Sequence, residues 1–127
     1  MTPEEERIIE AVNESREEIV DFASRLVAQP SILGQEQGAV QVMSDELDRL
    51  GWLPKRVPID PEALSGHPGF APVPWSYENK ENVVAVRPAD RSGGKSLLFN
   101  GHLDVVSPEP VEFWDMDPFE PRLDDDW

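Results

Sequence analysis

A histidine and an aspartate two positions apart, His102 and Asp104, are the side chains of this chain best suited to carry chemistry. They follow a run of large apolar residues over 97–99 and the small residue Gly101. In extended backbone, residues two apart lie on the same side. A carboxylate so placed can orient a metal-binding imidazole, or the pair can act together on a substrate. We therefore assign His102 as a candidate metal ligand and Asp104 as a candidate catalytic residue. A turn histidine bonded to a carboxylate for structural reasons is the alternative.

The other candidate side chains carry weaker signals. A metal site normally needs three or more protein ligands, and the only other histidine, His67, lies in a loop rich in glycine and proline, where an exposed side chain is expected. The run Asp124-Asp125-Asp126 could bind calcium, but it lacks the ligand spacing of a calcium loop and is expected to be solvated. Three aromatic residues, Phe70, Trp75 and Tyr77, could line a substrate pocket, although packing beneath a long loop is the commoner outcome.

Composition and charge restrict the classes of function. The 127 residues suffice for one domain, and the 39% hydrophobic and 29% charged residues are typical of a globular chain. A net charge of −15 argues against nucleic acid and anionic membrane surfaces as partners. Because there is no cysteine, any metal would need histidine and carboxylate ligands. No stretch has the length of a membrane span and no signal peptide is evident, so a cytoplasmic location is expected.

Two amphipathic helices are predicted within the first fifty residues. Thr2 and Glu5 have the types and spacing of a capping box, so the first helix is predicted to begin directly after Thr2. Its apolar residues recur near the helical period until Pro30 ends it. A second helix follows the loop over 30–34, and Gly51 stands where a left-handed C-terminal cap is required.

Three strands are predicted in the remainder. The stretch over 52–59 is restricted to a sheet edge by Pro54 and Pro58, and a second strand covers 82–87. The third covers 96–100 and is predicted to be buried because its apolar character is continuous. Residues 60–78 are predicted to be a loop. The fold class is therefore predicted to be α/β, with two N-terminal helices packed on a mixed, partly parallel sheet in which the strand ending at Asn100 is central.

The order of these features resembles the N-terminal part of the catalytic domain of the metal-dependent aminoacylase and exopeptidase family. This family includes acetylornithine deacetylase, succinyl-diaminopimelate desuccinylase, carboxypeptidase G and aminoacylase-1. The resemblance covers nearly the whole chain and is most specific where the block from Phe99 to Val106 is followed by the segment over 114–121. It also includes Pro30-Ser31, Gly34-Gln35-Glu36, Leu50-Gly51-Trp52 and residues 82–85. The loop over 60–77 is most similar to acetylornithine deacetylase-like members.

The resemblance implies a zinc-exopeptidase-like α/β/α sandwich that is incomplete in this chain. It also implies a metal-dependent N-deacylase or peptidase that acts on N-acylated amino acids or small peptides. By this resemblance His102 would bind one ion of a two-zinc centre, or of a zinc and cobalt centre, and Asp104 would hydrogen-bond its imidazole. In the family, a bridging aspartate, a glutamate pair and a second histidine complete the centre. None of these has a counterpart in residues 1–127.

We therefore expect residues 1–127 to be an N-terminal fragment of a metallohydrolase catalytic domain, without the lid and dimerisation domain and inactive alone. The complete protein is expected to bind a small-molecule or peptide substrate, and homodimerisation is an option for it. The alternative is a non-catalytic acidic interaction domain that retains the fold. The acyl group, the amine portion and the metal are left open.

Overall fold

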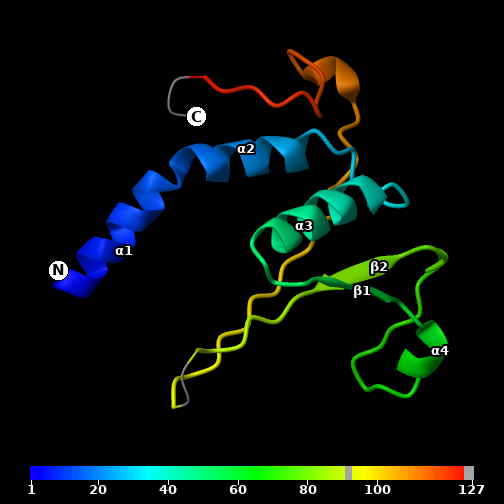
Figure 1. Ribbon diagram of the computed structural model, residues 1–127. Coiled ribbons are helices and arrows are strands. Elements are labelled where there is room, and N and C mark those ends of the chain that lie inside the picture. Colours follow the sequence, from blue (N-terminus) through cyan, green and yellow to red (C-terminus); the bar gives the residue numbers. More distant parts are fainter. Residues whose placement is uncertain (91–92, 125–127) are drawn as a thin grey trace.

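Helices dominate the computed structural model, which describes residues 1–90 and 93–124 (Figure 1). The sheet has two strands, and the α/β class is confirmed in this coarse form. The elements, in chain order, are α1 (Pro3–Glu14), α2 (Arg16–Val27), α3 (Gln37–Arg49), β1 (Lys55–Pro58), α4 (Pro61–Leu64), β2 (Glu81–Val84) and the 3₁₀ helix η1 (Val111–Phe113).

The first predicted helix is present, but it is divided at Ser15 into α1 and α2. Its start is confirmed: the Thr2 hydroxyl accepts from the Glu5 N–H at 3.2 Å, and the Glu5 carboxylate accepts from the Thr2 N–H at 2.7 Å. Ser15 has φ −86° and ψ 3°, and its hydroxyl donates to the Ala11 carbonyl at 2.9 Å. Serine hydroxyls that bond back to the preceding turn bend helices, which gives a physical reason for the change of direction.

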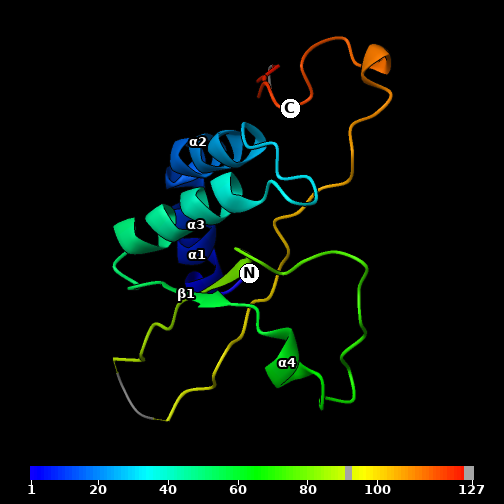
Figure 2. The same ribbon diagram turned by 90° about the vertical axis from the view of Figure 1, so that its right-hand side faces the viewer.

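Helix α3 lies between α2 and the sheet. In both views the C-terminal segment, α2, α3 and the sheet follow one another in that order (Figures 1 and 2). The predicted cap is confirmed, because Gly51 has φ +75° and its N–H donates to the Asp48 carbonyl at 2.8 Å. Within the described residues, Ala39 and Val40 of α3 are the buried hydrophobic side chains. The apolar core is therefore small and centred on this helix.

A buried carboxylate joins α2 to α3. Glu46 is only 7% exposed, and its oxygens accept from Arg25 Nη2 at 2.6 Å and from Arg49 Nη2 at 2.7 Å. Arg49 also donates to Glu18 at 3.0 Å. The hydrogen bonds from Arg49, which have the larger effect, and from Arg25 hold the pKa of Glu46 below its ordinary value. Because little apolar surface is buried, the hydrogen bonds of Glu46 with Arg25 and Arg49 are a main contribution to the packing of α2 against α3.

The two strands of the sheet run antiparallel; β1 lies within the predicted strand over 52–59, and β2 overlaps the predicted strand over 82–87. Their register pairs Lys55 with Val84 and Pro58 with Glu81. Pairing stops beyond Lys55 because Pro54 has no N–H, and Leu53, with φ +48°, turns the chain away. The predicted loop over 60–78 contains the single-turn helix α4, whose N-cap Asp60 accepts from the Glu62 and Ala63 N–H groups. A mixed sheet is not formed within the described residues.

The prediction of a buried central strand over 96–100 is wrong for this chain. These residues form no strand, and Leu97, Leu98 and Phe99 are 78%, 88% and 82% exposed. Strands buried on both faces need neighbouring strands and covering layers. Among the described residues β1 and β2 pair only with each other, and the segments over 85–90 and 93–100 extend away from the helices (Figure 1). The apolar run therefore lacks the partners that its composition requires.

Within residues 1–90 and 93–124, no helix combines the length and the apolar character needed to cross a lipid bilayer.

Replacing Glu46 by glutamine should lower the midpoint of thermal unfolding of this chain by roughly 3–6 °C at neutral pH. The depressed pKa of Glu46 in the folded state means that its contribution is fully present above about pH 4.5, its ordinary pKa, and is lost as the pH falls through the folded value. The difference from wild type, measured by circular dichroism melts, should therefore shrink in acid. Glu10→Gln, on the exposed side of α1, is the control and should leave the midpoint unchanged at both pH values. An equal effect of the two substitutions would contradict the role of Glu46.

Candidate functional site

The structure brings the two candidate site residues together. His102 Nδ1 lies 2.9 Å from the backbone oxygen of Asp104 and 3.4 Å from its carboxylate Oδ1. The side chains are 84% and 63% exposed. The segment is not a strand, yet the two side chains are close, as the two-residue spacing predicted. The nearer partner of the ring is the backbone carbonyl, whereas the resemblance had implied the carboxylate.

These contacts define which ring nitrogen of His102 carries the proton. A backbone carbonyl and an ionised carboxylate only accept hydrogen bonds, so Nδ1 must be the donor. In the neutral ring, the lone pair then lies on Nε2, on an exposed side chain. Metal-binding histidines are commonly held in this way, with the second nitrogen donating to a carbonyl or carboxylate. The arrangement therefore fits His102 as one ligand of a metal site and Asp104 as the residue that orients its ring.

The segment that follows the histidine is anchored to the loop between α2 and α3. The Val105 N–H donates to the Ser31 carbonyl at 3.0 Å, and Ile32 and Val105 form an isolated parallel bridge. Ser31 is 3% exposed, so this anchor is buried. Both ribbon views show the α2–α3 loop beside the segment around residue 105 (Figures 1 and 2). The motif is thus attached to the helical part of the molecule directly after Asp104.

An ion pair holds the same loop at its other end. Glu36 accepts from Lys80 Nζ at 2.7 and 2.8 Å, and from the Gly34 N–H at 3.0 Å. Partial burial raises the pKa of the Glu36 carboxyl, but the bonds from Lys80 and Gly34 outweigh it and leave the pKa below its ordinary value. Sequence reasoning found Glu36 only as part of the resemblance and assigned it no role. The position of Glu36 directly after the turn at Gly34 was the available signal for its role, whereas no sequence pattern around Lys80 indicated that it pairs with Glu36.

The weaker candidates do not join the site. His67 Nδ1 accepts from the Gly69 N–H at 3.1 Å within its own loop. Asp124 pairs with Arg122 at 2.9 Å, and its neighbours at 125 and 126 lie outside the described residues. In the part of the chain that the structure describes, no three histidine or acidic side chains come together as a metal site.

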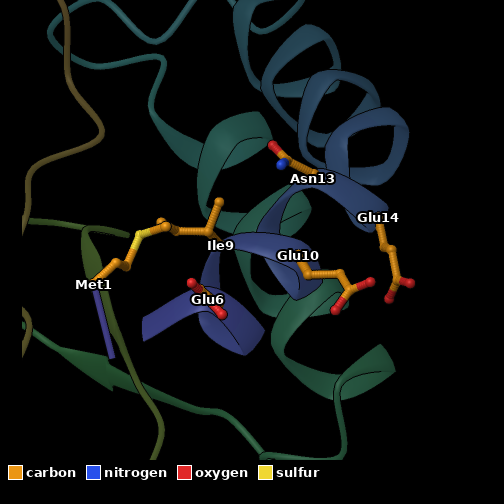
Figure 3. Close-up of a pocket in the computed structure, with 6 residues that line it drawn as sticks. All are labelled: Met1, Glu6, Ile9, Glu10, Asn13 and Glu14. Atoms are coloured by element: carbon orange, nitrogen blue, oxygen red, sulfur yellow. The ribbon is translucent and has the colours of Figure 1, made fainter. Parts of the chain in front are cut away.

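Two surface hollows are also separate from the site. One follows a face of α1, where Met1 and Ile9 lie among acidic side chains (Figure 3). The other lies between the α2 residues Val20, Ala23 and Val27 and the segment over 114–123. Neither is lined by the aromatic residues of the 60–78 loop, of which Trp75 is 44% exposed. Neither hollow therefore corresponds to the substrate pocket that the aromatic residues could have lined.

Comparison with known proteins identifies relatives that share one name, succinyl-diaminopimelate desuccinylase. The protein of Variovorax paradoxus (strain S110) is 33% identical over 103 residues, which are 80% of this chain and 23% of that protein. That of Rhizorhabdus wittichii is 32% identical over 104 residues, 82% of this chain and 23% of the relative. That of Stutzerimonas stutzeri (strain A1501) is 30% identical over 106 residues, which are 84% of this chain and 22% of the relative.

The chain spans about a quarter of the length of these curated relatives. No protein-family model and no solved structure matches it. The resemblance to a metal-dependent deacylase family is confirmed by the relatives. The narrower likeness to acetylornithine deacetylase-like members stays a prediction.

The two histidines should carry opposite neutral tautomers. His102 should be protonated at Nδ1, which faces only acceptors, and His67 at Nε2, because its Nδ1 accepts a bond. Long-range ¹H–¹⁵N correlation spectra of the chain, recorded at about pH 8, above the ordinary pKa of a histidine side chain, measure this directly. The variant His67→Ala assigns the signals. A His102 ring protonated mainly at Nε2 would contradict the site geometry.

Proposed function

Because the chain belongs to the metal-dependent aminoacylase and exopeptidase family, we propose that it forms the N-terminal part of the catalytic domain of a metal-dependent amide hydrolase. The reaction is removal of an acyl group from an N-acylated amino acid or small peptide. The name that the relatives share, succinyl-diaminopimelate desuccinylase, makes succinylated amines the first substrates to test. The observation that carries this proposal is the His102 ring, held through Nδ1 with Nε2 free.

The role of each residue follows from the contacts. His102 Nε2 serves as one ligand of a two-zinc centre, or of a zinc and cobalt centre. The Asp104 backbone oxygen keeps the ring proton on Nδ1, and its carboxylate, 3.4 Å away, helps to orient the ring. When bound, zinc supplies Lewis-acid chemistry for the hydrolysis of an amide. Asp104 thus acts through His102, and the general base and remaining ligands come from residues beyond those of this chain.

The wider expectations belong to the same proposal. The complete catalytic domain is an α/β/α sandwich around a mixed, partly parallel sheet, and residues 1–127 alone are inactive. The protein works in the cytoplasm, homodimerisation is an option for the complete protein, and its partners are small molecules or peptides rather than nucleic acid or membranes. The net charge of −15 supports the exclusion of polyanionic partners.

Replacing His102 by alanine should remove about one equivalent of zinc and reduce turnover by at least a hundredfold, because one metal ligand is lost. The assay uses the protein extended to the length of its relatives, with metal analysis and hydrolysis of N-succinyl and N-acetyl amino acids as readouts. His67→Ala is the matched control and should keep both metal content and turnover. Full zinc content together with full turnover in the His102→Ala protein would refute the proposal.

Replacing Asp104 by asparagine should have a smaller effect on the same extended protein. The backbone carbonyl remains as acceptor for Nδ1, so zinc stays bound, but the loss of the carboxylate should weaken zinc affinity by about 10–100-fold. Competition with a chelator measures this change. Unchanged affinity would show that the carboxylate does not support the ring, leaving the carbonyl as its only partner.

A further inference from the structure

We infer that the Glu36–Lys80 ion pair, acting through the loop over 31–35, sets which nitrogen of the His102 ring is free for a metal ion. Glu36 and Lys80 would then be positioning residues, because they act through other groups. Their importance for catalysis rests on the proposed function. The geometry of the ring does not rest on it.

The first step is the peptide unit between Asp104 and Val105. Its C=O lies 2.9 Å from His102 Nδ1, and its N–H donates to the Ser31 carbonyl at 3.0 Å. This unit is planar and trans, so its C=O and N–H point in opposite directions and rotate together. The Ser31 carbonyl therefore fixes the direction of the acceptor that the His102 ring uses.

The second step is the loop that carries Ser31. It turns through Gly34, which has φ +92°, and the Gln35 N–H donates to the Ile32 carbonyl at 2.8 Å. The Gly34 N–H donates to the Glu36 carboxylate at 3.0 Å. One carboxylate at the start of α3 thus closes the turn directly after the residues that bridge to Val105.

The third step connects this loop to the sheet. Lys80 precedes β2, and its carbonyl accepts from the Ile59 N–H at 3.0 Å, directly after β1. Its ammonium group contacts both oxygens of Glu36, and the two side chains are only 17% and 21% exposed. A partly buried, bidentate pair of this kind is screened by solvent far less than an exposed one. The loop is therefore held between α3 and the sheet.

The chain offers a matched ion pair beside the first. Glu81, next to Lys80, pairs with Arg56 at 3.3 Å, and these side chains are 32% and 31% exposed. This pair joins β2 to β1, and within the described residues it makes no hydrogen bond or ion pair with the loop over 31–35. Arg56 also donates to Gln41 of α3, so Glu81→Gln removes a neighbouring ion pair while it leaves every contact of the loop over 31–35 in place.

The test compares the ring tautomer of His102 in Glu36→Gln, Lys80→Gln and Glu81→Gln variants of the chain, by the same ¹⁵N spectra. Glu36→Gln and Lys80→Gln should each lower the ratio of Nδ1–H to Nε2–H at least twofold, because the Ser31 anchor loosens. Glu81→Gln should leave the ratio unchanged. The helix signal in circular dichroism reports whether each variant is folded, and the tautomer of His67, which depends on a contact within its own loop, serves as an internal reference.

An unchanged His102 ratio in both loop variants, or an equal change in Glu81→Gln, would overturn the inference. Should Glu36→Gln fail to fold, Lys80→Gln decides, since it keeps the bond between Glu36 and the Gly34 N–H. In the extended protein, Glu36→Gln should weaken zinc affinity about tenfold, the size expected for loss of a supporting contact. Absence of zinc binding by the extended wild type refutes the proposed function alone, because the tautomer test does not depend on metal.

Discussion

The hydrogen bond from the Val105 N–H to the Ser31 carbonyl is the contact on which the organisation of this chain depends. It joins the segment that contains the candidate site to the loop between α2 and α3. That loop is tied in turn to the sheet through Glu36 and Lys80. Without this hydrogen bond, Val105 would lose its bridge to Ile32, and the Asp104 carbonyl that contacts His102 would lose its fixed direction. This backbone bond therefore helps to fix the position of the candidate site relative to the helices.

Polar contacts carry an unusual share of the organisation because the apolar core is so small. Ala39 and Val40 are the buried hydrophobic residues of the described part, whereas Glu46 is buried between two arginines. Charge-assisted bonds of this kind impose direction as well as proximity, since a guanidinium group and a carboxylate match in only a few geometries. The relative placement of α2 and α3 is accordingly specific even though little apolar surface is buried.

Local signals in the sequence were reliable, and signals that depend on distant partners were not. The capping box at Thr2 and the glycine cap at Gly51 are decided by neighbouring residues, and both are found in the structure. The closeness of His102 and Asp104 follows from a spacing of two residues. The strand over 96–100 failed because burial depends on other strands, which the described residues do not provide. Contacts such as Glu36 with Lys80, 44 residues apart, leave no local pattern at all.

The division of the first helix at Ser15 has an energetic consequence. None of the residues of α1 is buried, so its twelve residues are held by their own backbone bonds, by the box at Thr2 and by little else. Isolated helices of this length are marginal in water. Opening of α1 would remove almost no apolar contact from α2 or α3, so it can melt and re-form without disturbing the site. We therefore expect α1 to open independently of the rest of the chain, with the boundary at Ser15.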